Sequence, residues 1–193
     1  MDVPVCLTDR DPNAAALGRL VAATPGARFE PGPVDATAVP ARLAGFRTLF
    51  TAFHHFRPAD ARAILAAAVR DRQGVAVAEA NTRTWAALAS AALVPLAVLA
   101  LTPAVRPFRW SRLAWTYPVP VLPLAIWYDG VVSTLRVYTP DERLAMAREV
   151  GGDEYDWEAG TLRPARSPIP ITSLIGVPRS PPPPPAPETR AVH

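Results

Sequence analysis

The 193-residue chain contains no lysine, and all 20 of its basic residues are arginine. A Schiff-base enzyme needs a lysine amine as its nucleophile, and a P-loop nucleotide hydrolase needs a lysine beside the phosphates. The sequence therefore excludes both classes. Glycine is also sparse, with 10 residues and no two of them separated by a single residue.

Cysteine is almost absent too, since Cys6 is the only one. A single cysteine excludes an intramolecular disulfide and a multi-cysteine zinc site, and nothing indicates an oxidising compartment. The first residues, MDVPVCLTDRD, include an early acid and no basic lead into an apolar run, which is not the pattern of a signal peptide. We expect a cytoplasmic protein, with membrane association left open by the apolar segment described below.

Acidic residues are missing from residues 84–128, where Arg106, Arg109 and Arg112 are the only charged side chains. The net charge of +3 is therefore concentrated in one short segment, RPFRWSR. A nucleic-acid reader would instead show a broad basic face. We expect no nucleic-acid partner.

Half of the residues are hydrophobic, which excludes wholesale disorder, and 24 prolines argue against an all-helical bundle. The first 83 residues alternate short apolar runs with helical patterns, which predicts an α/β domain with a mostly parallel sheet. The expected strands are Val3–Thr8, the continuously buried run Arg47–Phe53 and Gly74–Ala80. The expected helices are one capped by Asp11 with Pro12 in its first position, and one over Pro58–Val69.

A later helix has the clearest start, because Thr139 is followed by Pro, Asp and Glu142 in the pattern of a capping box. Gly151 is expected to end it. Two extended segments, Tyr155–Gly160 and Ile169–Val177, then predict an antiparallel hairpin. Residues 179–193 are expected to be a disordered proline-rich tail, either an SH3-type ligand or an inert end.

Two uncharged runs, 84–105 and 113–128, form the most unusual part of the sequence. The first is long enough to span a bilayer, whereas the second is shorter and carries three prolines. Three interpretations stay open: an apolar helical insertion over an active site, attachment to a membrane surface, or a helical hairpin across the bilayer with RPFRWSR as its positive loop. Four tryptophans fit an apolar pocket or a membrane surface equally well.

The order of several weak motifs carries a family resemblance. DRDPN, PVDAT, TLFTAFHHF, GVAVAEA, VVSTLRVYTPDE and the final ITSLIGVP follow one another over residues 3–178. In this order the chain resembles class I S-adenosylmethionine-dependent methyltransferases from their second strand onward. The resemblance implies a Rossmann-type α/β domain over residues 1–178, with 84–128 as an apolar helical insertion and an antiparallel hairpin at the carboxyl end.

The resemblance also implies site residues. Asp9 matches the acid that holds the ribose of S-adenosylmethionine, and Asp35 and Ala36 match the positions beside its adenine, although either aspartate could equally be a turn or helix cap. Phe53 follows the fourth family strand, where the methionine end of the cofactor is lined.

His54 and His55 share that segment and are candidate general bases, because an imidazole titrates near neutrality. The alternative is that one packs and the other bonds the backbone. Adjacent side chains point apart in extended structure, and two ligands do not make a metal site, so we expect none.

Two features depart from the family. The glycine-rich cofactor loop is missing, and the sequence begins at the second strand although the first family strand is central, between the second and the fourth. Such a sheet would have two facing unpaired edges, so either the protein starts upstream of Met1, or it is a degenerate copy, or another chain fills the gap.

The function expected from these motifs is methyl transfer to a small hydrophobic acceptor. The alternative is a non-enzymatic membrane-associated protein that retains a remnant of the fold, and a homo-oligomer is left open.

Overall fold

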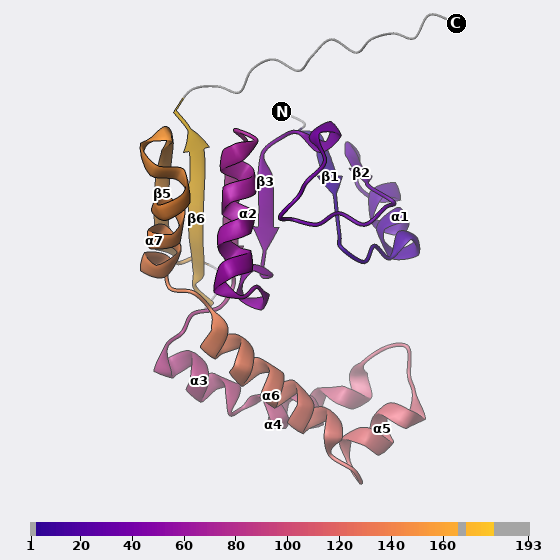
Figure 1. Cartoon of the computed structure of the whole chain (residues 1–193). Coiled ribbons are helices and arrows are strands. Elements are labelled where there is room, and N and C mark those ends of the chain that lie inside the picture. Colours follow the sequence, from indigo (N-terminus) through magenta and orange to yellow (C-terminus); the bar gives the residue numbers. More distant parts are fainter. Residues whose placement is uncertain (1–2, 166–168, 180–193) are drawn as a thin grey trace, which may run out of the picture.

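The computed structural model describes residues 3–165 and 169–179, and its described strands form two separate sheets (Figure 1). The smaller sheet pairs β1 (Val5–Leu7) with β2 (Ala27–Phe29) in parallel. The larger sheet has the order β3-β4-β6-β5. Its strands are β3 (Arg47–Phe50), β4 (Val75–Glu79), β5 (Tyr155–Leu162) and β6 (Ile171–Pro178). The chain is therefore mixed α/β, as the sequence predicts.

The hydrophobic core lies where α2 (Pro58–Arg70) and α7 (Pro140–Gly151) pack on the larger sheet (Figure 1). Along β4 every second side chain is buried, as expected of a central strand with one face against helices. The side chains of the core cluster come from α2, α7, β4, β6 and the 3-10 turn after β3, with Phe53, Leu65 and Leu174 among the largest. This core fixes the position of everything that follows β3 and β4 in the chain.

The amino-terminal unit, residues 3–46, has no comparable core. None of the residues of β1, β2 and α1 (Ala14–Ala22) is fully buried. Among the contacts that tie this unit to the rest, Gly45 N–H donates to the Gln73 side-chain oxygen at 2.9 Å, and Ala36 packs against the main core. Its stability therefore depends on few long-range contacts.

A break separates the two sheets at β1 and β3. No described strand pairs with the edge of β1 that faces away from β2, or with the edge of β3 that faces away from β4. Val5 N–H donates to the carbonyl of Gly26, just before β2, and Arg47 N–H donates to the carbonyl of Gly74, just before β4. Backbone groups alternate in direction along a strand, so those of Cys6 and Thr48 point to the unpaired edges. In Figure 1, β1 lies between β3 and β2 and runs in the same direction as β3.

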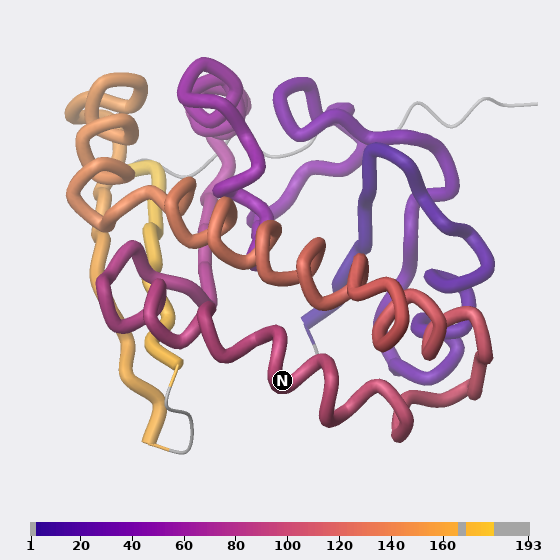
Figure 2. Tube along the Cα trace, turned by 90° about the horizontal axis from the view of Figure 1, so that it is seen from below, coloured from indigo at the N-terminus to yellow at the C-terminus, as the bar shows by residue number. Residues whose placement is uncertain are grey.

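A layer of helices covers the carboxyl ends of the parallel strands (Figures 1 and 2). The helical layer, residues 85–136, consists of α3 (Trp85–Ala91), α4 (Val94–Leu101), α5 (Trp110–Thr116) and α6 (Val121–Arg136). Figure 2, seen from below, shows α6 running across the molecule with α3 and α4 beside it. The predicted insertion, 84–128, is therefore helical as expected but extends to Arg136. The described part of the chain also contains four short 3-10 turns: η1 (Ala41–Leu43), η2 (Phe53–His55), η3 (Thr102–Ala104) and η4 (Gly152–Glu154).

The capping box at Thr139 is confirmed, because its hydroxyl accepts from Glu142 N–H and the Glu142 carboxylate accepts from Thr139 N–H. The helix predicted over Pro58–Val69 is confirmed as α2, the strand predicted over Gly74–Ala80 is confirmed as β4, and the carboxyl-terminal antiparallel hairpin is also confirmed. Within the predicted tail, Arg179 pairs with Asp156, whereas residues 180–193 lie outside the described residues.

The first helix cap was predicted at the wrong residue. Asn13 caps α1, since its side-chain oxygen accepts from Ala16 N–H at 3.0 Å. The Asp9 carboxylate accepts from Asp11 N–H at 2.8 Å, and this turn keeps Asp11 outside the helix.

The predicted buried strand Arg47–Phe53 is also wrong in part. The strand ends at Phe50, whose side chain is 69% exposed, and Phe53 lies in η2. The pairings within the first 83 residues, β1–β2 and β3–β4, are parallel as predicted, and the terminal hairpin adds antiparallel pairs to β4. Gly152, with φ of 47°, follows the last helical residue and ends α7, rather than Gly151.

Candidate functional site

A cavity of about 430 Å³ lies between the carboxyl ends of β3 and β4 and the helical layer. In an open α/β sheet, ligands bind beyond the carboxyl ends of the strands, so this is the expected position of a site. From the sheet side it is lined by Thr51, His54, His55 and Asn81. From the helical layer it is lined by residues of α3 and α6, with Ser90, Asp129 and Ser133 among the polar ones.

His54, which lines this cavity, forms a buried pair with Glu79. The His54 Nδ1 and Glu79 Oε2 atoms are 2.6 Å apart, and the two side chains are 5% and 1% exposed. Glu79 Oε1 accepts from Phe53 N–H at 2.7 Å and from His54 N–H at 3.3 Å. With Nδ1 donating to the carboxylate, Nε2 is the imidazole nitrogen left to accept a proton.

Glu79 is in position because it is the last residue of β4, where the inward side-chain alternation of Val75 and Val77 continues to the carboxylate. A buried carboxylate needs partners, and the N–H groups of η2 supply them. Burial lowers the pKa of Arg143, a fully buried residue of α7. The attraction between its positive charge and Glu79 opposes this shift, and the same charge compensates the buried carboxylate.

Arg143 also connects the sheet to α7. Its guanidinium donates to the Tyr138 carbonyl at 2.9 and 3.1 Å, to the Thr172 carbonyl at 3.2 Å and to the Thr172 hydroxyl. These acceptors satisfy the charged group without exposing it to water. The buried polar cluster therefore comprises His54, Glu79, Arg143 and Thr172.

Thr51, at the mouth of the cavity, has an unusual backbone conformation. Its φ is 49°, a left-handed value that β-branched residues rarely adopt. The strain is held by a hydrogen bond from Thr51 N–H to the Ala78 carbonyl at 2.8 Å. Strained residues of this kind concentrate at functional sites, which favours this cavity as the site.

The two predicted cofactor aspartates lie close together in the amino-terminal unit. The backbone N–H of Val34, the residue before Asp35, donates a hydrogen bond to the Asp9 carbonyl. Each aspartate makes a local turn through Oδ1, Asp9 to Asp11 N–H and Asp35 to Thr37 N–H and hydroxyl. The Thr37 hydroxyl and N–H lower the pKa of Asp35, which is an exposed carboxylate.

Of the other predicted residues, His54 and His55 reach the cavity, their rings 4.1 Å apart between centroids, with His55 exposed. Phe53 does not reach it: the ring is fully buried and packs edge-to-face on Tyr138. Its placement therefore does not favour a direct cofactor contact. Ala36 packs against the same core cluster that contains Phe53, which brings the Asp35 segment towards η2.

Sequence reasoning missed Glu79, Arg143 and Asp129. A lone acid that ends an apolar strand, as in GVAVAEA, was a signal that could have identified Glu79. Arg143 is one of several polar residues in its helix and carries no such signal. Asp129 is the first acid after the uncharged run, but only the tertiary structure places it at the cavity.

A second cavity, of about 730 Å³, lies over β5 and β6 and is bordered by Arg148, Asp153, Asp156 and Arg179. It is larger, but it contains none of the predicted site residues and lies away from the carboxyl ends of β3 and β4. We therefore place the candidate site at the smaller cavity.

The helical layer leaves most of its apolar side chains uncovered. One helical stretch, Trp85–Ala104, is long and apolar enough to cross a membrane, and only 11% of its most apolar window is buried. The helices α5 and α6 meet at an angle of 70°. The large exposed side chains include Leu93, Leu96, Trp110, Trp115, Leu124 and Trp127.

Within residues 3–165 and 169–179, no group of three histidine, cysteine or acidic side chains is placed to hold a metal ion. Comparisons with protein-family models, with curated proteins and with solved structures find no match to this chain. The function is therefore inferred from the geometry of the chain itself.

Proposed function

We propose that this chain belongs to an S-adenosylmethionine-dependent methyltransferase that acts on a small apolar acceptor. The observation that carries the proposal is the interrupted sheet. In the family that the sequence resembles, a central strand lies between the second and fourth strands. The break between β1 and β3 has that position, and both strands run in the direction that such a sheet requires (Figure 1).

The residues around the break fit part of the cofactor. Asp9 and Asp35 each keep Oδ2 free of hydrogen bonds to the described residues, so each can accept from a ligand. A ribose diol and an adenine amine are donors of the kind that these carboxylates would hold. S-adenosylmethionine supplies a methyl group on a positively charged sulfur.

The cavity under the helical layer supports an apolar acceptor, because α3 contributes small apolar side chains to its wall. Glu79 fixes His54 so that Nε2 is the basic nitrogen, and in this proposal His54 would take the proton of an acceptor hydroxyl whose oxygen receives the methyl group, while the S–CH3 bond breaks and leaves a neutral thioether. Positioning by the cavity supplies the rest of the catalysis.

Titration calorimetry with S-adenosylmethionine tests the proposal on the full chain. We expect heat of binding, and we expect Asp35→Asn to weaken it by about tenfold or more, the value of a hydrogen bond to a charged group. Asp153→Asn is the matched control, an exposed acid at the other cavity. A sample that is folded by circular dichroism but gives no heat contradicts the proposal.

The exposed helical layer favours a second candidate function, a non-enzymatic membrane-associated protein that retains the fold without the cofactor. In either case we propose that the protein is cytoplasmic and attached to a membrane through the layer, because uncovered apolar surface of this extent marks an interaction site. The calorimetric result separates the two candidates, since only the enzyme binds the cofactor.

A further inference from the structure

We infer that the helical layer lies in the plane of an anionic bilayer and that Arg106, Arg109 and Arg112 bind the lipid headgroups. These three residues are called the arginine turn. The inference rests on the membrane attachment proposed above, and it adds the lipid class and the orientation of the layer.

Charge identifies the occupant of the uncovered surface. From residue 84 to residue 128 the chain has three arginines and no acid, so this surface is complementary to anionic lipid and would oppose a cationic partner. Arg106 and Arg109 are exposed, and Arg112 is half-buried because its Nη1 donates to the Val105 carbonyl at 2.9 Å. The turn is thus fixed at one end of the layer, with its other two guanidinium groups free of ion pairs to the described residues.

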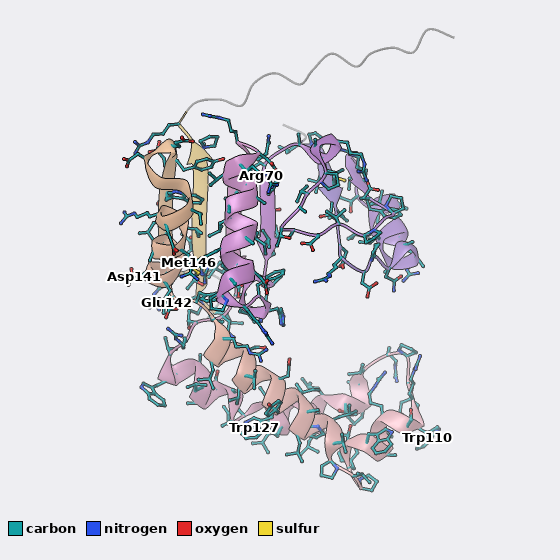
Figure 3. The ribbon with its side chains drawn as sticks, in the orientation of Figure 1. Arg70, Trp110, Trp127, Asp141, Glu142 and Met146 are labelled. Carbon is teal, nitrogen blue, oxygen red and sulfur yellow. The ribbon has the colours of Figure 1, made fainter. Side chains whose placement is uncertain are left out.

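Aromatic side chains surround this charge. Phe108 and Trp110 pack edge-to-face with ring centroids 5.1 Å apart, directly between the arginines in sequence, and Trp110 is 77% exposed. Figure 3 shows Trp110 of α5 at the end of the layer farthest from β5 and β6, and Trp127 of α6 nearer to those strands. Tryptophan beside arginine, next to exposed leucines, is the composition of a surface that sits at the level of lipid headgroups.

The geometry favours a layer that lies on the membrane over one that crosses it. The angle of 70° between α5 and α6 prevents the second uncharged run from forming a straight span. Asp129, which is exposed, lies in the middle of α6, and a carboxylate at the centre of a bilayer is costly. In the plane of the interface, the same carboxylate stays at the cavity and in contact with water.

Vesicle flotation with the full chain tests the inference, comparing phosphatidylcholine vesicles with vesicles that also contain phosphatidylglycerol. We expect tighter binding to the anionic vesicles, weakened by added salt, and quenching of tryptophan fluorescence by brominated acyl chains. Each arginine replaced by glutamine should weaken binding by about fivefold, and the triple variant by on the order of a hundredfold.

Two variants guard against a merely structural effect. Replacing the arginine turn by three lysines keeps the charge and should keep most of the binding. Replacing Arg19, Arg28 and Arg148, three exposed arginines outside the layer, by glutamine changes the net charge equally and should have little effect.

Equal binding to both kinds of vesicle would overturn the headgroup assignment, as would a lysine variant as weak as the glutamine variant. A chain that binds no vesicles and sediments as a dimer would show that a second copy covers the layer, which also overturns the inference. Binding of S-adenosylmethionine is measured separately, so its failure concerns the proposed enzyme and leaves the lipid result standing.

Discussion

The larger sheet and the helical layer use apolar residues in opposite ways. In the sheet with α2 and α7, side chains such as Leu65 and Leu174 are fully enclosed. In the layer, Leu93, Leu96 and Leu101 are more than half exposed. The two regions have similar residue types, yet one forms a protein interior and the other forms an outer surface.

The difference teaches that apolar content alone does not identify a core. In the sheet, the apolar residues recur with the period of a strand or one helix face, and polar residues fill the rest. In α4 nearly every residue is apolar, so no single face can be buried while the others meet water. A helix of this kind needs an apolar environment on several sides.

The largest expected contrast concerns arginine. Arg143→Ala should lower the free energy of unfolding by about 3–5 kcal/mol, because Tyr138 and Thr172 would lose their buried hydrogen-bond donor and Glu79 would lose a nearby positive charge. Arg109→Ala in the layer should change it by less than about 0.5 kcal/mol. Urea denaturation in a mild detergent measures both, and a loss of similar size at the two positions contradicts the comparison.

Leucine gives the next contrast. Leu65→Ala removes a fully buried side chain from α2 and should cost about 2–5 kcal/mol of stability. Leu96→Ala removes a side chain that is 64% exposed and should leave stability within about 0.5 kcal/mol, while weakening binding to vesicles. If Leu96→Ala destabilises the protein as much as Leu65→Ala does, Leu96 is buried in the folded protein, which contradicts the comparison.

A smaller contrast comes from two threonine caps. Thr139 caps α7, which packs on the sheet, and Thr84 caps α3 by accepting from Ala87 N–H at 3.2 Å. Thr139→Ala should cost about 1 kcal/mol in global unfolding. Thr84→Ala should cost less, since α3 contributes little to the core, and its effect should be seen as local fraying by hydrogen exchange of the α3 amides.

The smallest expected effect is on pH dependence. Burial opposes ionisation of Glu142, but Thr139 N–H and Arg83 outweigh it and lower the Glu142 pKa below its ordinary value of 4.5. A lowered carboxylate pKa stabilises the fold above the ordinary value, and that stabilisation is lost as pH falls through the lowered pKa. Glu142→Gln should flatten this acid limb of a stability-against-pH curve, whereas Glu158→Gln, an exposed control, should not.

Elements with local signals could be predicted from the sequence. The capping box needs only Thr139 and Glu142, three residues apart, so its hydrogen bonds follow from the local sequence. The same is true of the helix over 58–70, whose apolar spacing repeats within each turn. The cap of α1 was missed because Asp11 and Asn13 are both good caps, and their neighbours decided between them.

The candidate site was predicted only in part. His54 and His55 were predicted because their side-chain chemistry is distinctive, but Glu79, the partner of His54, is 25 residues away along the chain. Phe50 and Phe53 have the same side chain, and only the turn after β3 determines that Phe50 is exposed and Phe53 enclosed. Pairings at such separations depend on how the strands align.

By itself the sequence determined the α/β class, the capped helix α7, the terminal hairpin and an uncharged helical segment, because each depends on contacts between near neighbours or on composition. The tertiary structure alone decided that the parallel pairs do not join into one sheet, that the helical layer lies over the strand ends, and that Glu79 meets His54. The physical reason is that strand pairing and burial join residues far apart in the chain, and a sequence read locally does not record which edges meet.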